Sequence, residues 1–259
     1  MPFAARILLA LVVMLGAWTR PASAEAAPGA ARRLSLVIGA NDGGPGRARL
    51  RYAVSDARAV FQVLESLGGV LPDDGRLLLE PQREGLLWEL GRLRERLARL
   101  RPRSPRLEVL FYYSGHADAG HLLIGGERVS FRELREGLAA LEADARVVIL
   151  DSCASGAFLR AKGGSMRPPF LFDAANSMKG CAVMTSSSAD ESSQESERLR
   201  GSFFTRALIT GLRGAADAAG DGRVTLGEAY QFAFAETLRL TERAAGGPQH
   251  PSVDIQMTG

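Results

Sequence analysis

The sequence predicts an α/β fold in which a mostly parallel central sheet is covered by helices on both faces. Short apolar runs rich in branched side chains recur along the chain, and segments with helical spacing of leucine or alanine separate them. This alternation is typical of buried strands that are joined by crossover helices. Because no linker-like stretch divides the chain, we expect a single large α/β domain.

The first 24 residues are predicted to be a targeting segment rather than part of the fold. Arg6 provides a positive start, residues 7–18 form a short apolar core, and Ala22 to Ala24 offer a small-residue cleavage site. We expect an exported protein, periplasmic or secreted, without a stable membrane span after cleavage; an uncleaved N-terminal anchor is the alternative. The predicted organisation is a signal peptide at residues 1–24, a lead-in at 25–33 and a folded domain at 34–259.

Charge does not indicate a nucleic-acid partner. The chain has 32 Lys and Arg against 29 Asp and Glu, and Arg6 and Arg20 lie in the targeting segment. Without these two, the net charge is +1, which is far from the strongly basic balance of nucleic-acid-binding domains. The arginines of residues 91–106 alternate with leucines at helical spacing, which favours a solvated basic face on an amphipathic helix.

The predicted elements follow one another in a regular order. The first strand, at residues 34–40, precedes an Asn-Asp-Gly-Gly-Pro-Gly turn. A helix with an alanine and valine stripe is expected at residues 51–67, followed by a strand at 76–80 and the leucine-rich helix. In the last third of the chain we expect helices at residues 202–212 and 225–240 and a final strand at residues 250–255.

Two strand ends carry reactive side chains. Residues 107–113 form an apolar and aromatic strand, and His116 follows just past its end. Residues 147–151 form another strand, which is followed by Cys153 in a turn of small residues. The segment between the two strands has the length of a crossover, which places parallel strands side by side. We therefore expect His116 and Cys153 to face one another at the carboxyl edge of the sheet, where open α/β sheets bind ligands.

The motifs around these residues, YYSGHAD at residues 112–118 and VVILDSCASG at 147–156, resemble those of the caspase-like cysteine peptidases of clan CD, especially bacterial metacaspase relatives. The resemblance implies a caspase-like three-layer α/β/α sandwich and a cysteine endopeptidase acting on protein or peptide substrates. It also implies that Cys153 is the nucleophile and His116 the base. The backbone N–H groups of Ala117 and Cys153 would form the oxyanion hole.

The resemblance further implies a pocket for a basic side chain. Asp151, two residues before the nucleophile, stands where metacaspases have a pocket acid, and Asp190 resembles the second acid of that pocket. Two converging carboxylates select Arg or Lys before the cleaved bond through charge-assisted hydrogen bonds. The alternative is that Asp151 caps a helix and Asp190 is a solvated loop acid.

Two other classes of function stay open. The resembled family usually has glycine directly after the histidine, whereas this chain has Ala117. A catalytically inactive caspase-like domain that binds peptides or proteins is therefore the alternative function. A structural protein with a Cys153–Cys181 disulfide is a third reading, which we do not favour because Cys181 opens a predicted strand.

A calcium ion is the one cofactor that the sequence leaves open. Asp217, Asp221 and Glu228 fit most of a calcium-loop spacing, but Ala219 occupies the position of a further ligand. The same loop ends in a capping-box pattern from Thr225 to Glu228. We favour the capping interpretation, because Glu228 cannot easily serve both uses, and expect no other metal. Nothing in the sequence indicates an oligomeric state.

Overall fold

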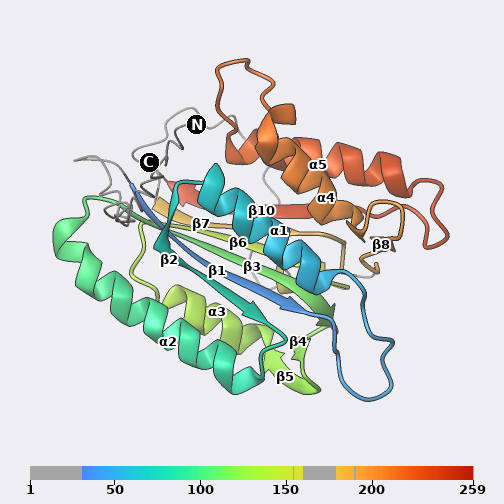
Figure 1. The fold of residues 1–259 in the computed structure, drawn as a ribbon, viewed down its shortest axis with the longest axis horizontal. Helices are drawn as coiled ribbons and strands as arrows, with labels where there is room; N and C mark the ends of the chain where they lie inside the picture. The colour runs from blue at the N-terminus through green and yellow to red at the C-terminus, as the bar shows by residue number, and fades with distance from the viewer. Residues whose placement is uncertain (1–30, 154, 160–178, 190, 259) are drawn as a thin grey trace, which may run out of the picture.

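A computed structural model describes residues 31–153, 155–159, 179–189 and 191–258, and one sheet between two layers of helices dominates it (Figure 1). The main strands are β1 (Arg32–Ala40), β2 (Val70–Leu79), β3 (Leu107–Ala117), β6 (Ala145–Asp151), β7 (Lys179–Thr185) and β10 (Ser252–Thr258). They lie in the order β10-β7-β6-β3-β1-β2, and the hairpin of β4 (His121–Ile124) and β5 (Glu127–Ser130) extends β3. Only β10 pairs antiparallel within that order, so the predicted mostly parallel sheet is confirmed.

Five α-helices cover the two faces of the sheet. One face carries α2 (Arg83–Leu100) and α3 (Phe131–Ala139), and the other carries α1 (Ala53–Ser66), α4 (Phe203–Thr210) and α5 (Leu226–Thr241). Alternate residues of β1 explain this division, since Leu36 packs toward α2 whereas Val37 packs toward α1 and α4. The expected three-layer α/β/α sandwich is therefore confirmed. The shorter elements are β8 (Glu195–Ser196), β9 (Gly201–Ser202), η1 (Arg101–Arg103), η2 (Ser155–Leu159) and η3 (Gly211–Ala215).

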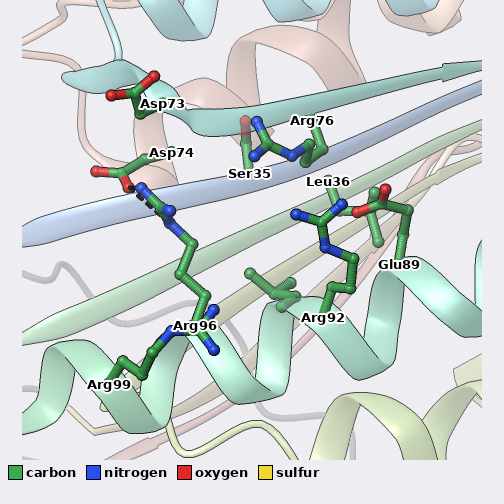
Figure 2. Close-up of a pocket in the computed structure, with 10 residues that line it drawn as sticks. Ser35, Leu36, Asp73, Asp74, Arg76, Glu89, Arg92, Arg96 and Arg99 are labelled. Atoms are coloured by element: carbon green, nitrogen blue, oxygen red, sulfur yellow. Dashed lines mark hydrogen bonds and ion pairs between the residues drawn. The ribbon is translucent and has the colours of Figure 1, made fainter.

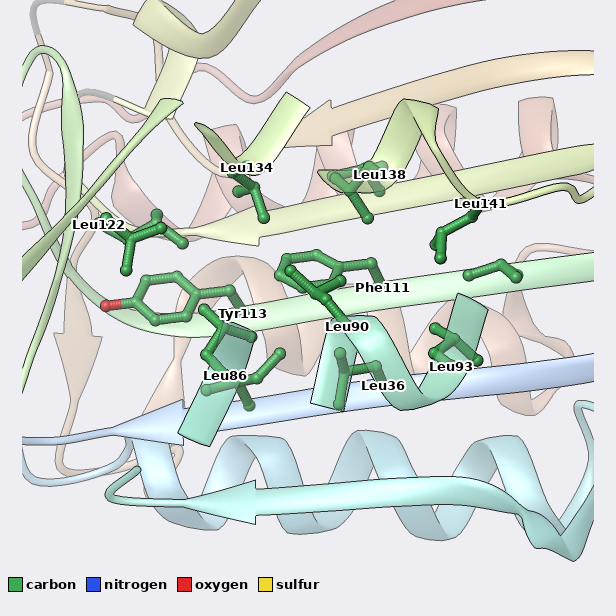
Figure 3. Packing of buried hydrophobic residues seen from close by; sticks show 14 of the residues in the cluster. Leu36, Leu86, Leu90, Leu93, Phe111, Tyr113, Leu122, Leu134, Leu138 and Leu141 are labelled. Carbon is green, nitrogen blue, oxygen red and sulfur yellow. The ribbon is translucent and has the colours of Figure 1, made fainter. Parts of the chain in front are cut away.

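The leucine stripe predicted for α2 forms the core on its side of the sheet. Figure 3 shows Leu86, Leu90 and Leu93 of α2 against Phe111 and Tyr113 of β3. Both aromatic side chains are fully buried, and each buried aromatic removes about 150–250 Å² from water. This packing holds β3, and therefore His116, in a rigid part of the molecule.

Several boundaries differ from the sequence prediction. Strand β3 continues to Ala117 instead of ending at residue 113, because His116 and Ala117 pair with Leu123 and Leu122 of β4. His116 thus lies within a strand rather than just past its end, and this fixes its backbone more firmly than a loop would. Strand β1 begins at Arg32, inside the stretch interpreted as a lead-in.

The targeting segment at residues 1–24 lies outside the described residues, so the signal peptide stays a prediction. None of the helices in the described part of the chain combines the length and apolar character that a membrane span requires.

Candidate functional site

Parallel pairing of β3 with β6 brings the two reactive side chains level with one another. Ser114 pairs with Asp151 at the last step of this ladder. His116 and Cys153 each lie two residues beyond that pair, at the carboxyl ends of neighbouring strands. Both line one cleft, so the juxtaposition expected from the sequence is observed. Their catalytic roles stay predictions.

A backbone carbonyl orients the ring of His116. Its Nε2 lies 2.9 Å from the carbonyl oxygen of Ala48, in the loop that follows β1. Because a carbonyl can only accept, Nε2 carries the hydrogen, and Nδ1 of the neutral ring keeps its lone pair. The other support is Gly43, where an added Cβ would lie 2.5 Å from the His116 Cδ2. The sequence of this segment indicates only a turn, because a backbone oxygen has no side-chain signature.

The thiol of Cys153 is partly exposed and has few contacts. Its Sγ lies 3.9 Å from the carbonyl oxygen of Ser193, a weak interaction for a thiol. Both cysteines are free. Cys181 pairs with Arg146 near the start of β6, so roughly 20 Å of strand separates it from Cys153. Since bridged cysteines need Cα atoms within about 7 Å, the disulfide reading is wrong.

The backbone around Ala117 is compatible with an oxyanion donor. The N–H of Asp118 donates to the His121 carbonyl at 3.0 Å. Because hydrogen-bonded and non-bonded pairs alternate in an antiparallel ladder, the Ala117–Leu122 pair is a non-bonded one. The Ala117 N–H therefore points away from β4. Its methyl group packs against the core, so the residue that replaces the usual glycine is accommodated.

Asp151 is a buried acceptor at the base of the cleft, with 3 % exposure. Its Oδ1 accepts from the Ser193 hydroxyl at 2.7 Å, and its Oδ2 accepts from the hydroxyls of Thr205 and Ser202. Ser202 is also the N-cap of α4. Asp151 therefore lines the cleft and accepts from Ser202, and Ser202 rather than Asp151 is the cap of α4. A role of Asp151 in a substrate pocket stays a prediction. Asp190 lies outside the described residues.

Two further acids belong to this region. Asp56 of α1 is fully buried, and its Oδ2 accepts from the Ser202 N–H at 2.8 Å. Burial and then the nearby Asp151 raise the pKa of Asp56 to about 8. Glu195 lines the cleft and accepts from the N–H groups of Arg51 and Tyr52. An acid within the apolar stripe of a predicted helix is the signal that could have identified Asp56 as a site residue.

A second cleft lies beside β1 and β2, and its lining includes Arg92, Arg96 and Arg99 of α2 (Figure 2). There the buried Asp74 accepts from Arg96 and from Arg32. Within the basic face that we expected to be solvated, Arg96 keeps 30 % of its side chain exposed and pairs with Asp74, because a buried carboxylate needs a cationic partner. No cysteine or histidine lines this cleft.

The loop with calcium-like spacing forms the capping box that we favoured. The hydroxyl of Thr225 accepts from the Glu228 N–H, and the Glu228 carboxylate accepts from the Thr225 N–H. Asp217 accepts from three backbone N–H groups, those of Gly220, Asp221 and Gly222. Among the described residues, no group of three or more His, Cys, Asp or Glu is arranged to hold a metal ion.

Comparisons with known proteins agree with this architecture. A family model described as the caspase domain, Peptidase C14, matches residues 32–257. The crystal structure of caspase-1 from Spodoptera frugiperda is similar, with a TM-score of 0.61 and 15 % identity over 86 % of this chain and 85 % of that one. At that identity the likeness shows the fold alone. A search of curated proteins found no match.

Proposed function

The chain belongs to the caspase-domain family, Peptidase C14, and from this premise we propose that it is a cysteine endopeptidase that uses Cys153 as nucleophile and His116 as base. One observation carries the proposal: the imidazole and the thiol lie at the ends of neighbouring strands and line the same cleft. A thiol becomes a good nucleophile when a base lies beside it. The family itself supports a peptidase that acts on protein or peptide substrates.

The proposed reaction is acyl transfer in two steps. Nδ1 of His116 takes the proton of the Cys153 thiol, and the thiolate attacks the carbonyl carbon of the scissile peptide bond. The N–H groups of Ala117 and Cys153 hold the oxyanion. When the C–N bond breaks, the imidazolium protonates the leaving amine and a thioester remains. His116 then deprotonates a water molecule, which attacks the thioester and releases the acid and the free thiol.

We propose that the residue before the cleaved bond is Arg or Lys. Among the described residues, the cleft is lined by the carboxylates of Asp151 and Glu195, and His116 is the only lining residue of basic type. Carboxylates that line a cleft favour a cationic side chain and disfavour an anionic one. Asp190, outside the described residues, stays in the proposal as a further acid of this pocket.

The test is hydrolysis of matched fluorogenic peptides that end in Arg, Lys or Asp, by the protein, its Cys153→Ala variant and its Cys181→Ala variant. We expect cleavage after Arg or Lys that is lost in Cys153→Ala and kept in Cys181→Ala. Cleavage after Asp alone contradicts the acidic pocket. No cleavage of any peptide while Cys153 is a free thiol contradicts the peptidase and leaves a binding module.

Export and calcium dependence are proposals that rest on the sequence alone. The mass of the protein recovered outside the cytoplasm tests the first, because removal of residues 1–24 leaves Glu25 at the N-terminus. Repeating the peptide assay with added calcium and with a chelator tests the second.

A further inference from the structure

One loop supplies both supports of the His116 ring. The loop between β1 and α1, residues 41–52, carries the Ala48 carbonyl that accepts from Nε2 and also Gly43, whose backbone lies against the ring. The loop closes on itself through a hydrogen bond from the Leu50 N–H to the Asn41 carbonyl at 2.9 Å. The position of the imidazole therefore depends on whatever holds this loop in place.

Glu80, directly after β2, clamps the loop on both sides of Ala48. Its Oε2 accepts from the N–H groups of Asn41 and Asp42 at 3.1 and 3.4 Å, where the loop begins. Its Oε1 accepts from the Arg49 guanidinium at 2.8 Å, directly after Ala48. The backbone N–H of Glu80 donates to the Gly39 carbonyl of β1 at 2.8 Å. One carboxylate thus ties the two arms of the loop to the edge of the sheet.

The backbone of Glu80 has an unusual conformation, which indicates that its surroundings hold the residue in place. Its φ of +48° lies in the left-handed region, where residues other than glycine are uncommon. A side chain held there is disfavoured unless its surroundings determine the conformation. Glu80 adopts this conformation where the chain leaves β2. Its side chain then points to the loop that follows β1, where the carboxylate accepts from Asn41.

The hydrogen bonds to backbone N–H groups matter more than the ion pair. The Glu80 and Arg49 side chains are 33 % and 65 % exposed, and ion pairs so exposed contribute little. A carboxylate that accepts from backbone N–H groups makes charge-assisted bonds, which are stronger than neutral ones. The far end of the loop is held in the same manner, since Glu195 accepts from the N–H groups of Arg51 and Tyr52.

We infer that Glu80 is a positioning residue for His116: it holds the loop whose Ala48 carbonyl keeps Nε2 protonated and Nδ1 available to the Cys153 thiol. Glu80 does not line the cleft, so it acts only through this loop. The inference rests on the proposed function, because it assigns importance to the same His116–Cys153 pair.

The experiment measures two quantities for the protein, His116→Ala, Glu80→Ala and Glu80→Gln. The first is kcat and KM on the peptide that is cleaved best. The second is the rate at which iodoacetamide alkylates Cys153 at neutral pH, followed by mass spectrometry of the peptide that carries it, which needs no turnover. The matched control is Glu133→Ala, since Glu133 is also 33 % exposed and forms an ion pair with Arg83, away from the loop.

We expect Glu80→Ala to lower kcat by about tenfold to a hundredfold with a smaller change in KM, because misplaced catalytic groups cost rates of that order. We expect alkylation of Cys153 to be slower in Glu80→Ala than in the parent protein, as it is expected to be in His116→Ala. Glu80→Gln, which keeps a neutral acceptor for the two N–H groups, recovers part of the loss. Glu133→Ala keeps kcat within about twofold.

The outcomes separate the inference from the function beneath it. If His116→Ala slows alkylation and Glu80→Ala leaves both alkylation and kcat unchanged, the inference is overturned and the dyad stands. If His116→Ala does not slow alkylation, the proposed dyad fails and the inference with it. If Glu80→Ala does not fold, Glu80→Gln decides: unchanged kcat and alkylation in that variant overturn the inference.

Discussion

Two clefts in the described part of the chain are lined by charged side chains, and only one of these two is suited to covalent chemistry. The cleft at the carboxyl ends of β3 and β6 contains a thiol and an oriented imidazole. The arginine-lined cleft beside β1 and β2 is lined by more charged side chains, but it contains neither a thiol nor an imidazole (Figure 2). At strand ends the chain leaves the sheet in small-residue turns, so backbone groups and reactive side chains converge. Beside the edge strand β2, the buried Asp74 pairs with Arg32 and Arg96.

The largest expected effect comes from replacing a glycine by alanine in each region, at Gly43 beside the ring of His116 and at Gly91 on α2. In Gly43→Ala the new Cβ lies 2.5 Å from His116 Cδ2, and we expect a loss of about a hundredfold in kcat from displacement of the ring. In Gly91→Ala on α2 the new Cβ meets no atom within 4 Å, and helix propensity adds up to about 1 kcal/mol to the free energy of unfolding. Peptide kinetics and urea unfolding of both variants check this. Equal kinetics in the two variants would contradict the structure of the loop.

The second prediction exchanges one buried carboxylate in each cleft. We expect Asp151→Asn to reduce kcat/KM on an Arg peptide by about tenfold to a hundredfold, because a charge-assisted contact contributes about 1.5–3 kcal/mol. A peptide with a neutral residue at that position should be much less affected. Asp74→Asn, which leaves Arg32 and Arg96 without their carboxylate, should lower the free energy of unfolding by on the order of 2 kcal/mol.

The ratio of the Arg and neutral peptides is the decisive measurement for this pair. That ratio should change in Asp151→Asn and stay constant in Asp74→Asn. A constant ratio in both variants would show that Asp151 only supports the α4 cap.

The third prediction concerns the pH dependence of stability. The pKa of Asp56 is about 8 in the folded protein and 3.8 as its ordinary value. Between these values the folded state binds more protons than the unfolded state, so this group lowers stability as pH rises from about 4 to about 8. Asp56→Asn should therefore lose less stability over that interval than the parent protein. Urea unfolding at a series of pH values measures the free energy of unfolding of both proteins. If that free energy changes with pH equally in the two proteins, the prediction is refuted.

The smallest expected effect lies away from both clefts, at the capping box of α5. Thr225→Ala removes the hydroxyl that accepts from the Glu228 N–H at 3.2 Å, and we expect a loss of about 1 kcal/mol in the free energy of unfolding. Peptide kinetics should not change. A rise in Tm on adding calcium to the parent protein would instead favour the metal interpretation of Asp217, Asp221 and Glu228.

The sequence alone predicted the juxtaposition of His116 and Cys153 that the structure shows. Apolar runs ending at small residues predicted that His116 and Cys153 share one edge of the sheet, because parallel strands present their carboxyl ends together. The same reasoning missed the supports of that pair. The carbonyl of Ala48 has no side-chain signature, and Asp56 was treated only as part of the helix expected at residues 51–67. Contacts made by backbone atoms, or across long sequence separations, are not encoded in local pattern.

Periodicity of apolar residues determined the α/β class and the parallel sheet, because burial on one or both faces acts on each segment locally. Tertiary structure decided how far β3 extends, since the pairing of His116 with Leu123 is formed with another strand. It also decided that the carboxylates of Asp56 and Asp151 share Ser202. Hydrogen bonds and electrostatic effects of this kind depend on distances that only the folded chain establishes.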